Sequence, residues 1–118
     1  MTSTESSYSI GGSTNFTVEA WVFPQWSNFS QIFNVSVGSA SNIQLMIGST
    51  NPGDIRLLVE ADNGTDLLDL TTGSALVPVG QWTHVAVSLS GTAGKIFING
   101  VVEASSTISG TRTHTGTV

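Results

Sequence analysis

The 118-residue chain contains no cysteine, so neither a disulfide framework nor a thiolate metal site is available to it. Charge is also scarce: charged residues make up 9% of the chain, and three Lys and Arg stand against eight Asp and Glu. The three cations, Arg56, Lys95 and Arg112, are far apart in sequence, which excludes the basic stripe of a nucleic-acid-binding protein. No apolar run approaches the roughly 20 residues of a membrane-spanning helix, so we expect no membrane insertion.

Hydroxyl side chains take the place of the missing charge, with 17 Ser and 15 Thr beside 13 Gly. Hydrophobic residues make up 39% of the chain, which is too many for an intrinsically disordered sequence. No segment shows the 3.6-residue apolar period of a helix, and no linker or repeat divides the chain. The composition therefore predicts one all-β domain over residues 1–118, built of short strands and turns.

Alternating or β-branched runs predict strands over residues 16–23, 30–37, 43–47, 55–60, 67–70, 82–89, 95–98 and 101–104. We expect turns at residues 38–42, 51–54 and 62–64, where Gly, Pro, Asn and Asp gather. The Asn99-Gly100 pair lies between two β-branched runs and predicts a hairpin closed by a type I′ turn, because both residues tolerate positive φ.

Three segments together resemble a known family. They are Phe-Thr-Val-Glu-Ala-Trp-Val at residues 16–22, Gln-Trp-Thr-His-Val-Ala-Val at 81–87, and Gly-Lys-Ile-Phe-Ile-Asn-Gly-Val at 94–101. In this order and spacing they resemble the laminin G-like domains of the concanavalin A-like lectin/glucanase superfamily, over roughly residues 10–118. The resemblance implies an antiparallel β-sandwich of the jelly-roll type. It also implies roles in carbohydrate recognition, cell adhesion, or structural use on phage virions and tail fibres.

The chain departs from the family pattern at both ends. Only residues 7–10 stand where such domains usually open with a Phe-x-Gly-x-x-Asp-Tyr-like strand. The closing strand pair, with its Gly-x-Ile-Asp-Asp/Glu-like motif, has no counterpart. A sandwich without these strands exposes unpaired backbone. We therefore expect either a fragment of a longer chain, or an edge completed by another subunit in a homo-oligomer or by a partner strand.

Catalysis is not expected. A glycosidase needs two carboxyl groups that face each other across the scissile bond. Sugar-cleaving relatives carry a Glu-x-Asp-x-x-Glu-like run, which this chain lacks. The eight acids lie mostly in or beside expected turns: Glu5, Glu19, Asp54, Glu60, Asp62, Asp66, Asp69 and Glu103. His84 lies within a predicted strand, where we expect a packed, hydrogen-bonded histidine rather than a member of a catalytic triad.

Calcium is the one cofactor that the sequence suggests. Asp62, Asn63 and Asp66 bring three oxygen-bearing side chains into one tight turn, and oxygen ligands are those that Ca²⁺ prefers. The spacing is not that of a helix-loop-helix calcium loop. The alternative is a hairpin turn stabilised by Asx hydrogen bonds without a metal.

Aromatic side chains beside planar polar groups suggest a carbohydrate site. Glu19, Trp21 and Phe23 share one face of the first strand, where they would line a concave groove. Trp26, together with Asn28, would line the rim formed by the following loop and is the stronger candidate of the two tryptophans. The alternative is that Trp21 and Trp82 pack in the core.

The sequence favours a non-catalytic carbohydrate-binding or adhesion module whose partner is a glycan or cell-surface glycoconjugate. Low charge and many hydroxyl groups suit an extracellular or virion surface, although residues 1–12 lack the basic and apolar segments of a secretion signal. The alternative is a structural virion or appendage subunit, such as a decoration or tail protein, whose sandwich mediates assembly.

Overall fold

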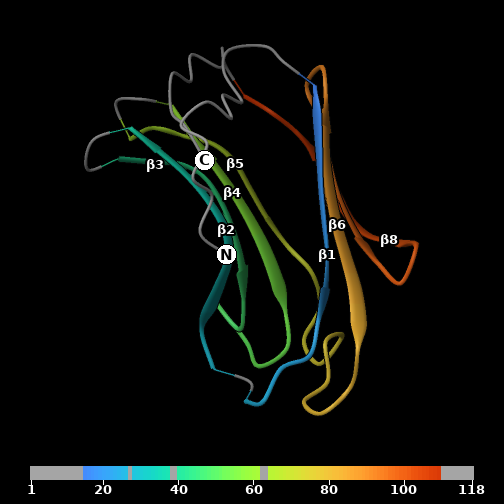
Figure 1. Cartoon of the computed structure of the whole chain (residues 1–118). Helices are drawn as coiled ribbons and strands as arrows, with labels where there is room; N and C mark the ends of the chain where they lie inside the picture. The colour runs from blue at the N-terminus through green and yellow to red at the C-terminus, as the bar shows by residue number, and fades with distance from the viewer. Residues whose placement is uncertain (1–14, 27, 38–39, 62–63, 110–118) are drawn as a thin grey trace, which may run out of the picture.

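The computed structural model describes residues 15–26, 28–37, 40–61 and 64–109. These residues form two four-stranded antiparallel sheets that pack face to face as a β-sandwich (Figure 1). Sheet A has the order β2 (Ser30–Val37), β3 (Ala40–Ile47), β4 (Ile55–Glu60), β5 (Asp66–Thr71). Sheet B has the order β1 (Phe16–Val22), β6 (Thr83–Ser90), β7 (Ala93–Ile98), β8 (Val101–Thr107). Among the described residues no helix is long and apolar enough to cross a membrane.

The all-β sandwich confirms the predicted fold class, and each predicted strand has its counterpart. The prediction of a long turn at residues 38–42 is wrong, because β3 already begins at Ala40 and pairs with Val37 of β2. The antiparallel ladder between β2 and β3 therefore continues almost to the hairpin end. Pro24, which has no N–H to donate, follows the end of β1 at Val22, in agreement with the sequence.

Alternating apolar residues form the core between the sheets. Ile43 and Leu45 from sheet A and Val85 and Leu89 from sheet B are all 0% exposed. Burial of each such side chain contributes about 1.5–3 kcal/mol. The sheets approach closely at Gly94 in β7, where an added Cβ would lie 2.5 Å from Cδ2 of Leu68 in β5. A side chain at this position would require the Leu68 side chain to move.

The core is less complete along β1 and β2 than along β4 and β6. The inward side chains of β1, such as Phe16, Val18 and Val22, are only partly buried where they pack on the core. On β6, by contrast, Val85 is 0% and Val87 1% exposed. Because β1 is an edge strand of sheet B, its inward face has a neighbouring strand on one side only. The outward side chains of β1 are exposed.

A buried carboxylate organises the loop between β3 and β4. Asp54 is 0% exposed. Its Oδ1 accepts a hydrogen bond from the backbone N–H of Ser49 at 3.0 Å. Its Oδ2 accepts from the N–H groups of Thr50 at 3.1 Å and Asn51 at 2.7 Å. One side chain thus satisfies three backbone donors, which is why the loop closes tightly before β4 begins.

We expect Asp54→Ala to lower the free energy of unfolding by about 2–4 kcal/mol, because three backbone donors lose a charged acceptor in a part-buried loop. Urea unfolding followed by circular dichroism measures this. Asp54→Asn, which retains one carbonyl acceptor, serves as the graded control with a smaller loss. Equal stability of Asp54→Ala and the parent protein would contradict this role.

Candidate functional site

Polar and aromatic side chains lie on the outer face of sheet B, opposite the face that packs in the core. Along β1 the residues that alternate with the core row are Thr17, Glu19 and Trp21, and all three are exposed. The antiparallel register pairs Trp21 with His84 on β6. Since side chains of directly paired residues lie on the same face of a sheet, this register brings an imidazole beside an indole.

Trp21, His84 and Glu19 form a compact cluster on this face. The ring centroids of Trp21 and His84 are 5.2 Å apart with an interplanar angle of 63°, an edge-to-face arrangement. Nε2 of His84 lies 3.5 Å from Oε2 of Glu19. The His84 side chain is 25% exposed and that of Glu19 67% exposed. His84 therefore lies close to both Trp21 and Glu19, while part of its side chain remains accessible to solvent.

The β7–β8 turn borders the cluster and projects away from sheet A (Figure 1). Asn99 and Gly100 have φ values of 49° and 82°, which confirms the predicted hairpin turn with two residues of positive φ. Oδ1 of Asn99 accepts a hydrogen bond from the backbone N–H of His84 at 3.0 Å. The N–H of Asn99 donates to the carbonyl of His84 at 2.8 Å. The turn is therefore tied to the same residue whose side chain faces Trp21.

A shallow hollow of about 440 Å³ lies between these groups, lined by Trp21, His84, Asn99 and Gly100. Its chemistry combines an exposed aromatic face with hydrogen-bonding side chains. Because Oδ1 of Asn99 is engaged by the backbone, its Nδ2 group is the part of the exposed amide that remains for a ligand. A ligand with an apolar ring face could stack on Trp21 and direct its hydroxyl groups toward His84 and Asn99.

A second ring pair extends the aromatic surface. Phe23 and Trp82 lie just beyond the paired ends of β1 and β6, with ring centroids 5.3 Å apart. We call the four residues Trp21, Phe23, Trp82 and His84 the aromatic face. Trp21 and Trp82 are each 65% exposed, so the interpretation that they pack in the core is wrong. The reason is register: the adjacent positions Val22 and Thr83 point inward, and the tryptophans therefore point outward.

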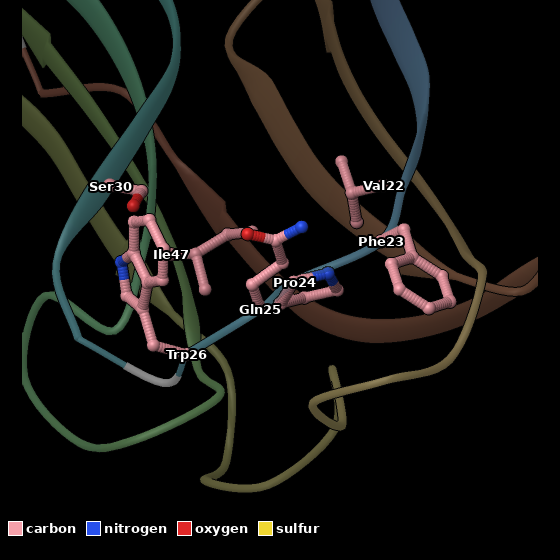
Figure 2. Close-up of a pocket in the computed structure, with 7 residues that line it drawn as sticks. All are labelled: Val22, Phe23, Pro24, Gln25, Trp26, Ser30 and Ile47. Atoms are coloured by element: carbon pink, nitrogen blue, oxygen red, sulfur yellow. The ribbon is translucent and has the colours of Figure 1, made fainter.

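Trp26 lies at a different place. It lines a pocket of about 300 Å³ at the end of the sandwich, in the segment between β1 and β2. Figure 2 shows Trp26 beside Ser30 and Ile47, with Gln25 between Trp26 and Val22. Asn28 is exposed in the same segment and is not among the residues that line either hollow. The structure therefore brings Glu19 and Trp21 together, and it places Trp26 and Asn28 apart from them.

His84 and Asn99 are the members of the site that sequence reasoning missed. The sequence pattern indicates only packing and hydrogen bonding for His84, and only a turn for Asn99. A usable signal was present, because Val85, Val87 and Leu89 alternate as core residues and so direct His84 to the opposite face. The contact between Asn99 and the backbone of His84 depends on the β6–β7 pairing, which the sequence does not display.

The predicted calcium turn lies partly outside the described residues, since Asp62 and Asn63 belong to the part that is not described. Asp66 is described and pairs with Glu60 across β4 and β5. Desolvation, followed by the hydrogen bond and negative charge of Asp66, raises the pKa of Glu60 above its usual value. Within the described ranges, no group of three or more acids or histidines gathers as a metal would require. Calcium at this turn stays a prediction.

A bidentate ion pair lies next to these acids on sheet A. Nε and Nη2 of Arg56 each donate to a carboxylate oxygen of Asp69 at 2.7 Å. This hydrogen bond, with the charge of Arg56, holds the pKa of Asp69 below its usual value of 3.8. The pair joins β4 to β5 across the outer face of sheet A. The side chains are 27% and 42% exposed, so solvent screens much of the attraction.

These features define the class of protein: an antiparallel β-sandwich of the jelly-roll kind, with an open, aromatic outer face on one sheet. A laminin G family model, described as the concanavalin A-like lectin/glucanases superfamily, matches residues 2–118, and the chain belongs to this family. Separate searches of curated proteins and of solved structures found no match. The family description covers both lectins and glucanases, so membership fits carbohydrate binding and does not by itself exclude catalysis.

We expect Asp69→Asn to lower the free energy of unfolding by about 0.5–1 kcal/mol at pH 7, after allowance for solvent screening. A carboxyl whose folded-state pKa is lowered stabilises the protein above its unfolded pKa, and this contribution is lost as pH falls through the folded pKa. Urea unfolding should therefore show the difference at pH 7 and a progressively smaller one as the pH falls through the lowered folded-state pKa of Asp69. A difference that grows toward acid pH would contradict the assignment.

Glu60→Gln is the matched control, because the pKa of Glu60 is raised whereas that of Asp69 is lowered. A raised folded-state pKa means that the ionised form of Glu60 is disfavoured in the folded protein. Its contribution is greatest below the unfolded pKa and is lost as pH rises. The substitution should leave stability at pH 7 equal or higher.

Exposure of all three tryptophans has a direct spectroscopic consequence. Trp21 and Trp82 are 65% exposed and Trp26 is 58% exposed. We expect the native emission maximum to lie close to that of the urea-unfolded chain, and acrylamide to quench native fluorescence efficiently. A strongly blue-shifted native spectrum with poor quenching would show that the tryptophans are buried, as the alternative interpretation of the sequence holds.

Proposed function

We propose that the chain is a non-catalytic carbohydrate-binding domain that holds a glycan in the hollow beside Trp21. The observation that carries the proposal is the placement of an exposed indole next to three hydrogen-bonding side chains, Glu19, His84 and Asn99. A pyranose ring has apolar C–H faces and a rim of hydroxyl groups, and it matches such a combination of ring and polar edge.

The geometry favours binding over hydrolysis. The carboxylate beside the hollow, Glu19, approaches His84 rather than a second carboxyl group. The acids Glu60, Asp66 and Asp69 belong to the other sheet, on β4 and β5. A glycosidase needs its two carboxyl groups on both sides of one scissile bond, and the described part of the chain places no such pair at this hollow.

The proposal includes a setting on an extracellular or virion surface, where glycans are met. Its support is compositional: few charges and many Ser and Thr residues. The affinity of one shallow subsite should be modest, in the range of about 10 μM to 1 mM, since a single stacked ring and a few exposed hydrogen bonds supply only several kcal/mol.

Glycan-array screening followed by calorimetry tests the proposal. We expect Trp21→Ala to weaken binding by about tenfold or more, because the stacking surface is removed, and Glu19→Gln to weaken it less. Trp26→Ala is the matched control, since it removes an indole that is 58% exposed, against 65% for Trp21, from a pocket that Trp21 does not line. Loss of binding in Trp26→Ala alone would move the site to the segment between β1 and β2.

A second candidate function, a structural subunit, has its own support in the open side of the sandwich. β5 packs against β7 and β8, so β1 and β2 lie at the opposite side. Their inward residues, including Val18, Ile32 and Phe33, are only partly buried. A strand from a neighbouring subunit would cover them. An empty array together with a multimeric native mass in light scattering would favour this function over carbohydrate binding.

A further inference from the structure

The aromatic face contains two ring pairs rather than one, and they follow each other along the same two strands. Trp21 and Phe23 are two residues apart on β1 and its continuation, and Trp82 and His84 are two apart at the start of β6. Residues at this spacing project from the same face, with Cα atoms about 6.7 Å apart. The contact between Phe23 and Trp82, at 5.3 Å between centroids, shows that these side chains lie against each other just past the last registered pair, Val22 and Thr83.

This separation is of the same order as the length of one sugar unit in a linear polysaccharide. A ring stacked at Trp21 therefore has a second aromatic surface within reach of the next unit. The hollow lined by Trp21, His84, Asn99 and Gly100 accounts for only the first of these positions. The ring of Trp82 is 65% exposed and does not line this hollow.

The tilt of the rings restricts the shape of a ligand that can contact both ring pairs. The interplanar angle is 63° for Trp21 and His84 and 54° for Phe23 and Trp82. Four coplanar rings would form a flat platform suited to a crystalline polymer surface, but the two rings within each pair are tilted and do not form such a platform. A single chain, which can contact one ring of each pair, suits this arrangement.

Charge restricts the ligand further. The chain has a formal net charge of −5, and Glu19 lies within the site. Arg56 is bound to Asp69 on sheet A and is not available to this face. Lys95 pairs with Ser88, four positions along β6 from His84. Recognition of sulfate, phosphate or carboxylate groups requires clustered cations, which the described part of this face does not have.

We propose that the aromatic face binds a linear, uncharged polysaccharide as a single chain across at least two subsites, the first at Trp21 and His84 and the second at Phe23 and Trp82. The inference rests on the proposed function and adds the ligand class and the second subsite. Phe23 and Trp82 are binding residues in this assignment, because each would contact the sugar that follows the one stacked on Trp21.

The test is calorimetry of the full chain with glucose and mannose and with soluble β-1,4-glucose, β-1,3-glucose and β-1,4-mannose oligomers, from disaccharide to hexasaccharide. We expect affinity to rise by about tenfold from the monosaccharide to the oligomers of the series that binds. Trp82→Ala should remove most of that gain and leave monosaccharide affinity within about twofold, because the second sugar unit is the first to reach Trp82. Trp21→Ala should weaken both. Phe23→Ala serves as the second variant. Phe29→Ala is the control, since it removes an exposed ring that lines neither hollow.

The outcomes separate the two proposals. Binding of a monosaccharide and of its oligomers that depends on Trp21, with no gain from length and no effect of Trp82→Ala, would keep the proposed function and overturn the second subsite. Tighter binding of heparin than of any neutral oligomer would overturn the ligand class. If none of these ligands binds, and Trp82→Ala instead changes the native mass, the face is a protein interface and both proposals are wrong.

Discussion

The antiparallel register between β1 and β6 is the constraint on which both faces of sheet B depend. Trp21 opposite His84 and Val18 opposite Val87 are two consequences of the same ladder. A slip of one residue would turn every side chain of β1 to the other face, so the partly buried valines and the exposed tryptophan are specified together. The core that stabilises the sandwich therefore also determines the surface that is proposed to bind glycan.

The two sheets contribute unequally. Sheet A supplies much of the fully buried core, with Ile43, Leu45 and Leu57 among its completely inaccessible residues, and its outer face carries the Arg56–Asp69 ion pair. Sheet B supplies the other half of the core through β6 and β7, and it leaves aromatic rings in solvent at the end of β1. Exposed tryptophan rings do not contribute the favourable free energy of burial, and exposed apolar patches of this kind often mark a binding surface.

Family membership and surface chemistry support each other without being the same argument. The family description spans lectins and glucanases, and the fold is shared by both. A fold does not assign a function; the residues of the site do. Here the proposal of carbohydrate binding rests on the indole, imidazole and amide at one hollow, where Glu19 approaches His84.

The sequence by itself determined the class of fold, the positions of the strands and the Asn99-Gly100 turn, because period-two alternation and turn chemistry act over only a few neighbouring residues. It also identified Glu19 and Trp21 as companions on one strand. Only the tertiary structure decided that both Trp21 and Trp82 are exposed, that His84 and Asn99 lie beside Trp21, and that Trp26 lines a different hollow. The contact of Trp21 with His84 depends on pairing between segments more than 60 residues apart, and local patterns carry no record of such pairing.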